Sequence, residues 1–168
     1  STVMSLPELH MALDKGEAPD DAVAITFDDG YIDNMRLATP ILRKHRCPAT
    51  IFVATGTLGV RREFWWDEIE RLILHPVRLP EVIEIEIAGD RRSWTIETGR
   101  TRGPLCRWRT RGWRAWHEND PTSRQRVYRE LWALLHPLDV ETRNAALRDL
   151  ATRLGAGEDG RATHRIVN

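Results

Sequence analysis

Two adjacent carboxylates, Asp28 and Asp29, are the residues of this sequence whose types and spacing best suit chemistry. They follow the short apolar run from Val23 to Phe27, which is rich in β-formers and predicts a buried strand. Gly30 comes next and allows the backbone to turn sharply. Carboxylates beside apolar walls are costly unless they are compensated, and a divalent metal is a common compensation. A carboxylate beside a metal can act as a base, so this pattern indicates metal-assisted chemistry.

The same residues have a plainer interpretation, because Asp-Gly is a common turn pair. Asp29 and Gly30 could form a solvated turn or a helix cap that binds nothing. The apolar run in front favours chemistry, since ligand sites of α/β proteins lie at the carboxyl ends of such strands. Two other classes with acidic sites fit less well. Haloacid-dehalogenase-like phosphatases need Asp-x-Asp, and receiver domains need an aspartate after a later strand and a lysine beyond it.

A helix is predicted before the acidic pair. Ser5 and Glu8 have the spacing of a capping box, and Gly16 suits a helix stop. Residues 6–15 should therefore be helical.

A second helix and a second strand are predicted after the acidic pair. The helix should begin at Asp33 or Asn34 and run towards Arg46, with a kink or break at Pro40. Residues 48–54 predict another buried strand. Strand, helix and strand in this order predict a βαβ unit, so the two strands should be parallel neighbours.

The second half of the chain changes to a hairpin and helices. Isoleucines at 83, 85 and 87 alternate with glutamates, Gly89-Asp90 is turn-forming, and residues 93–97 alternate again. Together these patterns predict an antiparallel β-hairpin. Two buried strands are too few for a closed barrel, so the sequence predicts an α/β architecture that is begun and not finished. The other predicted segments are a helix over 65–74, an irregular insertion over 91–116, a helix from Thr122, a helix from Asp139 and a loose tail over 155–168. In the helix from Asp139, the side chains of Val140, Leu147 and Leu150 should face inward.

Several motifs around the acidic pair occur in a familiar order. The run is Thr26-Phe27-Asp28-Asp29-Gly30-Tyr31, then Asn34, then Pro40-Ile41-Leu42, then Pro48-Ala49-Thr50-Ile51-Phe52-Val53. It resembles the opening of the polysaccharide deacetylase family, which is the nodulation-protein-B homology domain or carbohydrate esterase family 4. Further segments are similar to a subgroup with a long insertion before its second motif: Phe64-Trp65-Trp66-Asp67-Glu68, Leu131-Trp132 and Thr163-His164-Arg165.

The resemblance implies a fold and an activity. The fold would be an incomplete (β/α) barrel of the deacetylase type, a single domain over 1–168 with an insertion over about 76–155. The activity would be hydrolytic removal of N-acetyl groups from N-acetylglucosamine-containing poly- or oligosaccharides. Asp28 would be the catalytic base and Asp29 a ligand of a divalent metal, by family resemblance zinc. The resemblance assigns no substrate-binding residue.

The sequence also departs from the family, whose metal site is completed by a His-x-x-x-His-Pro motif. No two of the six histidines have that spacing; His75-Pro76 and His136-Pro137 match only its end. The family's arginine-proline-tyrosine, aspartate-tryptophan and leucine-histidine motifs are missing as well. We therefore expect the amino-terminal part of a deacetylase, inactive alone. The alternative is a non-catalytic carbohydrate-binding or degenerate homologue.

A second group of residues mixes tryptophan with arginine. It could stack on sugars, bind nucleic acid, or pin a loop to the core with its tryptophans while the arginines stay solvated. The last interpretation is favoured. The group consists of Trp94, Trp108, Trp113 and Trp116 with Arg91, Arg92, Arg100, Arg102, Arg107, Arg109, Arg111 and Arg114.

Composition excludes several classes of protein. The 168 residues are 41% hydrophobic and 30% charged, which is typical of a globular protein. The formal net charge is zero, so the overall charge does not favour binding to nucleic acid or to a membrane. No apolar run approaches the roughly 20 residues that span a bilayer. Residues 1–9 show no secretory signal, so a cytoplasmic location is expected. Cys47 and Cys106 form no CxxC motif and predict neither a zinc knuckle nor a disulfide framework.

Overall fold

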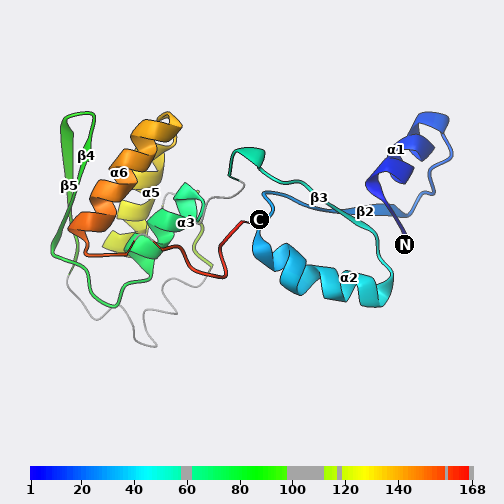
Figure 1. Cartoon of the computed structure of the whole chain (residues 1–168), viewed down its shortest axis with the longest axis horizontal. Coiled ribbons are helices and arrows are strands. Elements are labelled where there is room, and N and C mark those ends of the chain that lie inside the picture. Colours follow the sequence, from blue (N-terminus) through cyan, green and yellow to red (C-terminus); the bar gives the residue numbers. More distant parts are fainter. Residues whose placement is uncertain (58–61, 98–111, 117–118, 158, 167–168) are drawn as a thin grey trace. The chain divides into compact units, whose positions relative to one another are not determined.

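A computed structural model describes residues 1–57, 62–97, 112–116, 119–157 and 159–166. The chain divides into two compact units (Figure 1). Unit 1 comprises Ser1–Glu63 with Gly160–Asn168, and unit 2 comprises Phe64–Asp159. The expected single domain with an insertion over 76–155 remains a prediction.

Unit 1 is built on a three-stranded parallel sheet in the order β1-β2-β3. The strands are β1 (Thr2–Met4), β2 (Ala22–Phe27) and β3 (Ala49–Ile51). The register pairs Val3 with Val23 and Thr26 with Thr50. The predicted parallel pairing of the two strands that flank the second helix is therefore confirmed. β1 was not predicted, because three residues are too short to show a period.

The helices of unit 1 follow their local signals. Helix α1 (Leu6–Lys15) begins with the predicted capping box of Ser5 and Glu8 and ends at Gly16, whose φ is 69°. The second helix begins as a π-helix, η1 (Asn34–Ala38), and continues as α2 (Thr39–His45), with Pro40 in the first turn of α2. Pro40 thus marks the predicted break. A short 3-10 turn, η2 (Thr55–Thr57), follows β3.

The strands of unit 1 are less buried than predicted. No residue of β1, β2 or β3 is classed as buried, and Val23 is 43% exposed. The prediction of two buried strands was wrong, because burial depends on layers that cover the sheet and local sequence does not report them. Parallel sheets are normally covered on both faces. The described residues form a mixed α/β unit with a parallel sheet, and they form no closed barrel.

Unit 2 combines a hairpin with helices. Helix α3 (Trp65–Ile69) continues into a π-helix, η3 (Glu70–Leu74), as the predicted helix over 65–74 required. Strands β4 (Val82–Ile87) and β5 (Asp90–Thr95) are antiparallel, which confirms the hairpin. The turn is Ala88-Gly89 rather than Gly89-Asp90, since Ala88 and Gly89 have φ of 51° and 90° and Asp90 pairs with Ile87. Strand β5 contains residues 93–95, as the predicted alternation over 93–97 required, and it also contains Arg91 and Arg92, which were expected in the irregular insertion.

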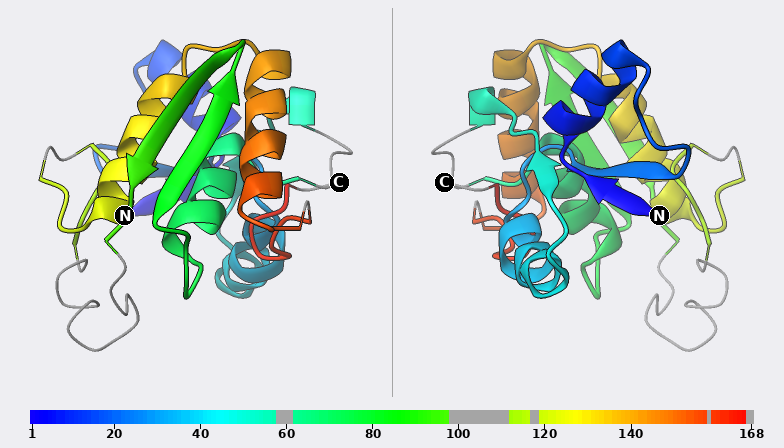
Figure 2. Two further views of the ribbon diagram at one scale, coloured as in Figure 1. Left: turned by 90° about the vertical axis from the view of Figure 1, so that its left-hand side faces the viewer. Right: turned by 90° about the vertical axis from the view of Figure 1, so that its right-hand side faces the viewer.

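The hydrophobic core of the described residues lies mainly in unit 2. Helix α6 (Val140–Arg153) packs against strand β4, and helix α5 (Ser123–Leu135) packs against η3 in the same unit (Figure 2). Thr122 and Asp139 occupy the N-cap positions, so both helices begin where the sequence predicted. Val140, which was predicted to face inward, is 64% exposed. The fully buried large side chains are Ile69, Leu72, Ile73, Ile83, Ile85, Val127, Leu131, Leu135, Leu147 and Leu150.

The end of the chain is partly ordered by pairing, which corrects the expected loose tail. Ile166 forms an antiparallel bridge with Tyr31 and is 3% exposed. Arg165 forms a second antiparallel bridge with Glu63. These contacts join distant parts of the sequence within unit 1. Throughout the described ranges, no helix has both the length and the apolarity needed to cross a membrane.

Candidate active site at the acidic turn

The acidic turn, which we define as Asp28-Asp29-Gly30, directly follows β2, the middle strand of the parallel sheet. The Gly30 amide donates a hydrogen bond of 2.8 Å to the Asp28 carbonyl oxygen, which tightens the turn. Asp29 and Gly30 both have positive φ, 68° and 73°. Aspartate tolerates this left-handed conformation better than most residues do. The two carboxylates therefore stand at the carboxyl end of a parallel strand, where α/β proteins place ligands.

Gly30 is required for a second reason, which is space. A Cβ atom at this position would lie 3.1 Å from Val53 Cγ1 and 3.3 Å from Val53 Cα. Phe52 continues the pairing of β2 and β3 by donating its amide to the Phe27 carbonyl oxygen at 2.8 Å. The end of β3 thus holds one side of the turn.

Asp28 and Asp29 are both exposed. This differs from the expectation of carboxylates beside apolar walls. Exposure leaves both carboxylates accessible to water, a cation or a sugar. Their roles as base and ligand remain predictions.

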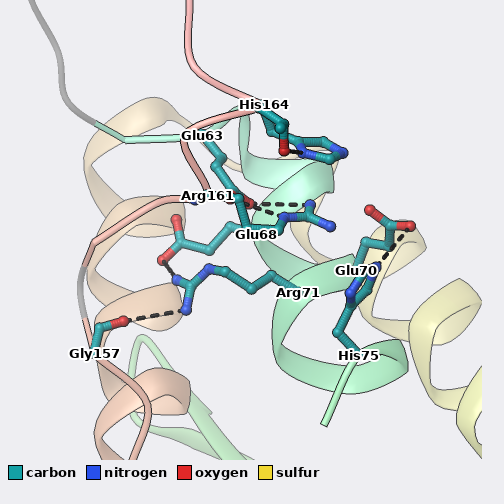
Figure 3. Close-up of polar contacts among 9 residues, drawn as sticks. Glu63, Glu68, Glu70, Arg71, His75, Gly157, Arg161 and His164 are labelled. Carbon is teal, nitrogen blue, oxygen red and sulfur yellow. Dashed lines mark hydrogen bonds and ion pairs between the residues drawn. The ribbon is translucent and has the colours of Figure 1, made fainter.

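The other side of the turn is held by the segment 164–166. The Ile32 amide donates a hydrogen bond of 2.8 Å to the Arg165 carbonyl oxygen, beside the bridge between Tyr31 and Ile166. The segment is itself anchored by an ion pair in which Arg161 Nε lies 2.9 Å from Glu63 Oε1 (Figure 3). Sequence reasoning missed Glu63 and Arg161, because neither belongs to a periodic pattern and they are distant in the sequence.

The described residues bring no cluster of potential metal ligands to the acidic turn. Among the described residues, no group of three His, Cys, Asp or Glu side chains with ligand atoms within 4.8 Å of one another includes Asp28 or Asp29. His75 instead lies 3.5 Å from Glu70, and His136 stacks on Trp132 with ring centroids 4.5 Å apart. His75 and His136 thus have partners within unit 2 and do not supply the missing histidine motif.

The described tryptophans of the second group have different environments. Trp94 packs against the core and donates its indole N–H to Glu130 at 2.6 Å. Trp113 makes an edge-to-face contact with Tyr128, whereas Trp116 is 76% exposed. Two of these three side chains fit the interpretation that they pin the loop. Trp108, Cys106 and the arginines between 100 and 111 lie outside the described residues.

Cys47 shows no feature of a nucleophile. It is a free cysteine of intermediate burial whose Sγ contacts the His45 carbonyl oxygen at 3.5 Å. A reactive thiol needs a base or an electropositive setting. Among the described residues, the contact of Cys47 Sγ is with a backbone carbonyl oxygen and not with a basic side chain.

The architecture and the turn together define a mixed α/β protein with two carboxylates at the carboxyl end of a central parallel strand. Comparison with known proteins shows which family the amino-terminal part of the chain is similar to. Residues 15–79 match the family described as polysaccharide deacetylase. The Bacillus subtilis (strain 168) protein named "Putative polysaccharide deacetylase YxkH" is 32% identical over 73 residues, which make up 43% of this chain and 26% of that protein. Residues 15–79 of this chain are therefore similar to the polysaccharide deacetylase family.

The match covers little of the relative. The chain spans 26% of the length of the curated relative that it matches. No solved structure matches the chain. The matched residues include the acidic turn, the helix after it and β3, which are the elements that carried the resemblance in the sequence.

Proposed function

We propose that this chain serves metal-dependent N-deacetylation of N-acetylglucosamine-containing poly- or oligosaccharides. Asp28 is the proposed base and Asp29 the proposed metal ligand. The observation that carries the proposal is the place of the acidic turn, because two exposed carboxylates end the middle strand of the sheet inside the family match. The family match supports the reaction class. The metal, the substrate and the roles of the two aspartates are proposals.

The carboxylates suit a divalent cation in charge and donor type but do not complete a site. Carboxylate oxygens bind zinc and other divalent metals, and zinc sites usually need three protein ligands. Among the described residues no third ligand joins the pair. A bound cation would lower the pKa of a water molecule and polarise the acetamide carbonyl. Asp29 is the residue of this chain that would hold it.

The chemistry assigned to this chain's own residues is proton transfer. The exposed Asp28 carboxylate accepts a proton from a water molecule as the water oxygen attacks the acetamide carbon. The carbon–nitrogen bond then breaks, acetate leaves, and the sugar nitrogen takes a proton to become an amine. The family's histidine acid for this last step has no counterpart at a matching position in this sequence.

Acetate release from chitooligosaccharides in the presence of Zn²⁺ tests the proposal. The measurement uses the protein as its native source makes it, with Asp28→Asn and Asp29→Ala as variants. We expect Asp28→Asn to abolish acetate release while metal affinity is largely kept, because the amide cannot accept the proton. Asp29→Ala should weaken metal binding. Full activity in Asp28→Asn would rule out the base assignment.

A second candidate is a non-catalytic carbohydrate-binding or degenerate homologue. Two observations favour it: the sequence contains no His-x-x-x-His pair, and Trp116 exposes 76% of its surface. An exposed indole can stack on a sugar ring. Quenching of tryptophan fluorescence by chitooligosaccharides without acetate release would support this candidate. Loss of that quenching in Trp116→Ala would locate the contact, and acetate release would exclude the candidate.

A further inference from the structure

We propose that Glu63 and Arg161 are positioning residues for the acidic turn. Their ion pair fixes the segment 164–166 against the residues that follow Gly30. The inference rests on the proposed function, since the ion pair positions functional groups only if the acidic turn carries the base and the metal ligand. Each step of the contact path lies within unit 1.

The ion pair is buried and has a defined geometry. Arg161 Nε and Nη2 donate to the two oxygens of Glu63 at 2.9 and 3.2 Å, and the Arg161 backbone amide also donates to Oε1 (Figure 3). The Glu63 side chain is 1% exposed and the Arg161 side chain 18%. A forked arginine–carboxylate contact fixes orientation as well as distance. Because a buried charge without its partner is very unfavourable, the two residues must stay together.

Gly160 brings the backbone close enough for this pair to form. A Cβ atom at this position would lie 2.8 Å from Glu63 Cγ and 3.1 Å from the Glu63 amide nitrogen. Any larger residue would displace Glu63, whose carboxylate is already held at both oxygens. Gly160 is therefore needed for the Glu63–Arg161 ion pair, although the glycine itself carries no charge.

The contact path continues from the pair to the turn. Glu63 forms an antiparallel bridge with Arg165, so the pair and the bridge hold one short segment at two points. The carbonyl oxygen of Arg165 then accepts the Ile32 amide at 2.8 Å. On the other side of the turn Gly30 packs against Val53.

The forked pair also fixes the register of the segment. A slip of one residue would reverse the side-chain directions of the bridged residues and would move the Arg165 carbonyl away from the Ile32 amide. An apolar contact at the same place would resist such a slip less well, because it has no preferred direction. The backbone immediately after Asp28 and Asp29 would then lose its partner on this side.

The test compares two variants that disturb the pair with one matched control. Gly160→Ala displaces Glu63 without changing charge, and Arg161→Lys keeps the charge but loses the fork. Gly157→Ala is the control, since a Cβ atom there has no neighbour within 4 Å. Circular dichroism confirms that each variant is folded, and a variant that fails this check is replaced by Glu63→Gln.

Two readouts are measured on the full chain: hydrogen exchange of the Ile32 amide, and Mn²⁺ affinity at the turn from paramagnetic broadening of its amide resonances. We expect Ile32 exchange to rise about tenfold in Gly160→Ala and Arg161→Lys and to be unchanged in Gly157→Ala. We expect Mn²⁺ affinity to fall by about tenfold or more in the same two variants, as it does when groups behind a metal ligand are disturbed.

The outcomes separate this inference from the proposed function. If the wild-type chain binds Mn²⁺ at the turn and both disturbing variants match it in affinity, the positioning role is overturned while the proposed function stands. Unchanged Ile32 exchange in folded variants would also overturn it. If the wild-type chain shows no Mn²⁺ broadening at the turn, the metal-ligand assignment fails, and the positioning role fails with it. Ile32 exchange then shows only whether the contact path exists.

Discussion

Trp94 of β5 donates its indole N–H to the carboxylate of Glu130 on α5, with a distance of 2.6 Å between nitrogen and oxygen. The hydrogen bond joins the hairpin to a helix of the same unit. Trp94 also packs against the buried core of unit 2. This tryptophan is therefore a structural residue, which removes it from the group that could contact a sugar.

The first prediction is that this pair stabilises unit 2 cooperatively. Hydrogen bonds to charged groups contribute about 1.5–3 kcal/mol, so the coupling between Trp94 and Glu130 should be about 1–2 kcal/mol because both are only partly buried. A double-mutant cycle of Trp94→Phe and Glu130→Ala, followed by urea unfolding, measures it. Strict additivity of the two single variants would show that the contact contributes nothing.

The second prediction concerns two residues on α6. Leu147 is fully buried, and its replacement by alanine should lower the free energy of unfolding by about 2–5 kcal/mol through lost contacts and the cavity. Val140 is 64% exposed, so Val140→Ala should change it by less than about 0.5 kcal/mol. Thermal or urea unfolding checks both. Equal losses would place Val140 inside, as the sequence had predicted.

The third prediction is a loss of stability at high pH through Tyr128. Burial first, and then the negative charges of Glu70 and Asp67, raise the pKa of Tyr128 from 10.0 to about 12. The neutral phenol is therefore favoured by folding, and its contribution is fully present below pH 10 and is lost as pH rises towards 12. Because the ring is partly exposed, we expect a loss of only about 1 kcal/mol.

Ultraviolet titration and unfolding at several pH values measure this effect. The chain has two tyrosines, so Tyr128→Phe leaves Tyr31 as the single remaining phenol. The high-pH ionisation and the accompanying loss of stability should both disappear in this variant. Unchanged titration curves would mean that Tyr128 is not held in its neutral form by the fold.

The sequence predicted those parts of the structure that depend on neighbouring residues. The capping box of Ser5 and Glu8 determined where α1 begins, and alternating isoleucines determined β4. Even there the hairpin turn was misplaced by one residue. Ala88 adopts a positive φ that sequence statistics disfavour for alanine, and so Asp90 belongs to the strand.

The features that the sequence did not predict depend on distant residues. β2 looked buried because its residues are apolar, but burial requires other layers, and the described residues leave it partly exposed. The pairing of Tyr31 with Ile166 and of Glu63 with Arg161 joins segments far apart in the chain, and no local pattern marks either contact. The acidic turn itself was found because its chemistry is local: a strand, two carboxylates and a glycine.

The most direct test of the account is where a divalent cation binds. Mn²⁺ is titrated into the chain and its broadening of amide resonances is mapped, with Zn²⁺ as competitor. We predict broadening that is centred on Asp29, is reversed by Zn²⁺, is largely kept in Asp28→Asn and is lost in Asp29→Ala. Asp33→Ala is the control, since Asp33 is an exposed aspartate nearby that makes no capping hydrogen bond. Broadening that is centred elsewhere, or that survives in Asp29→Ala, would contradict the metal-dependent function.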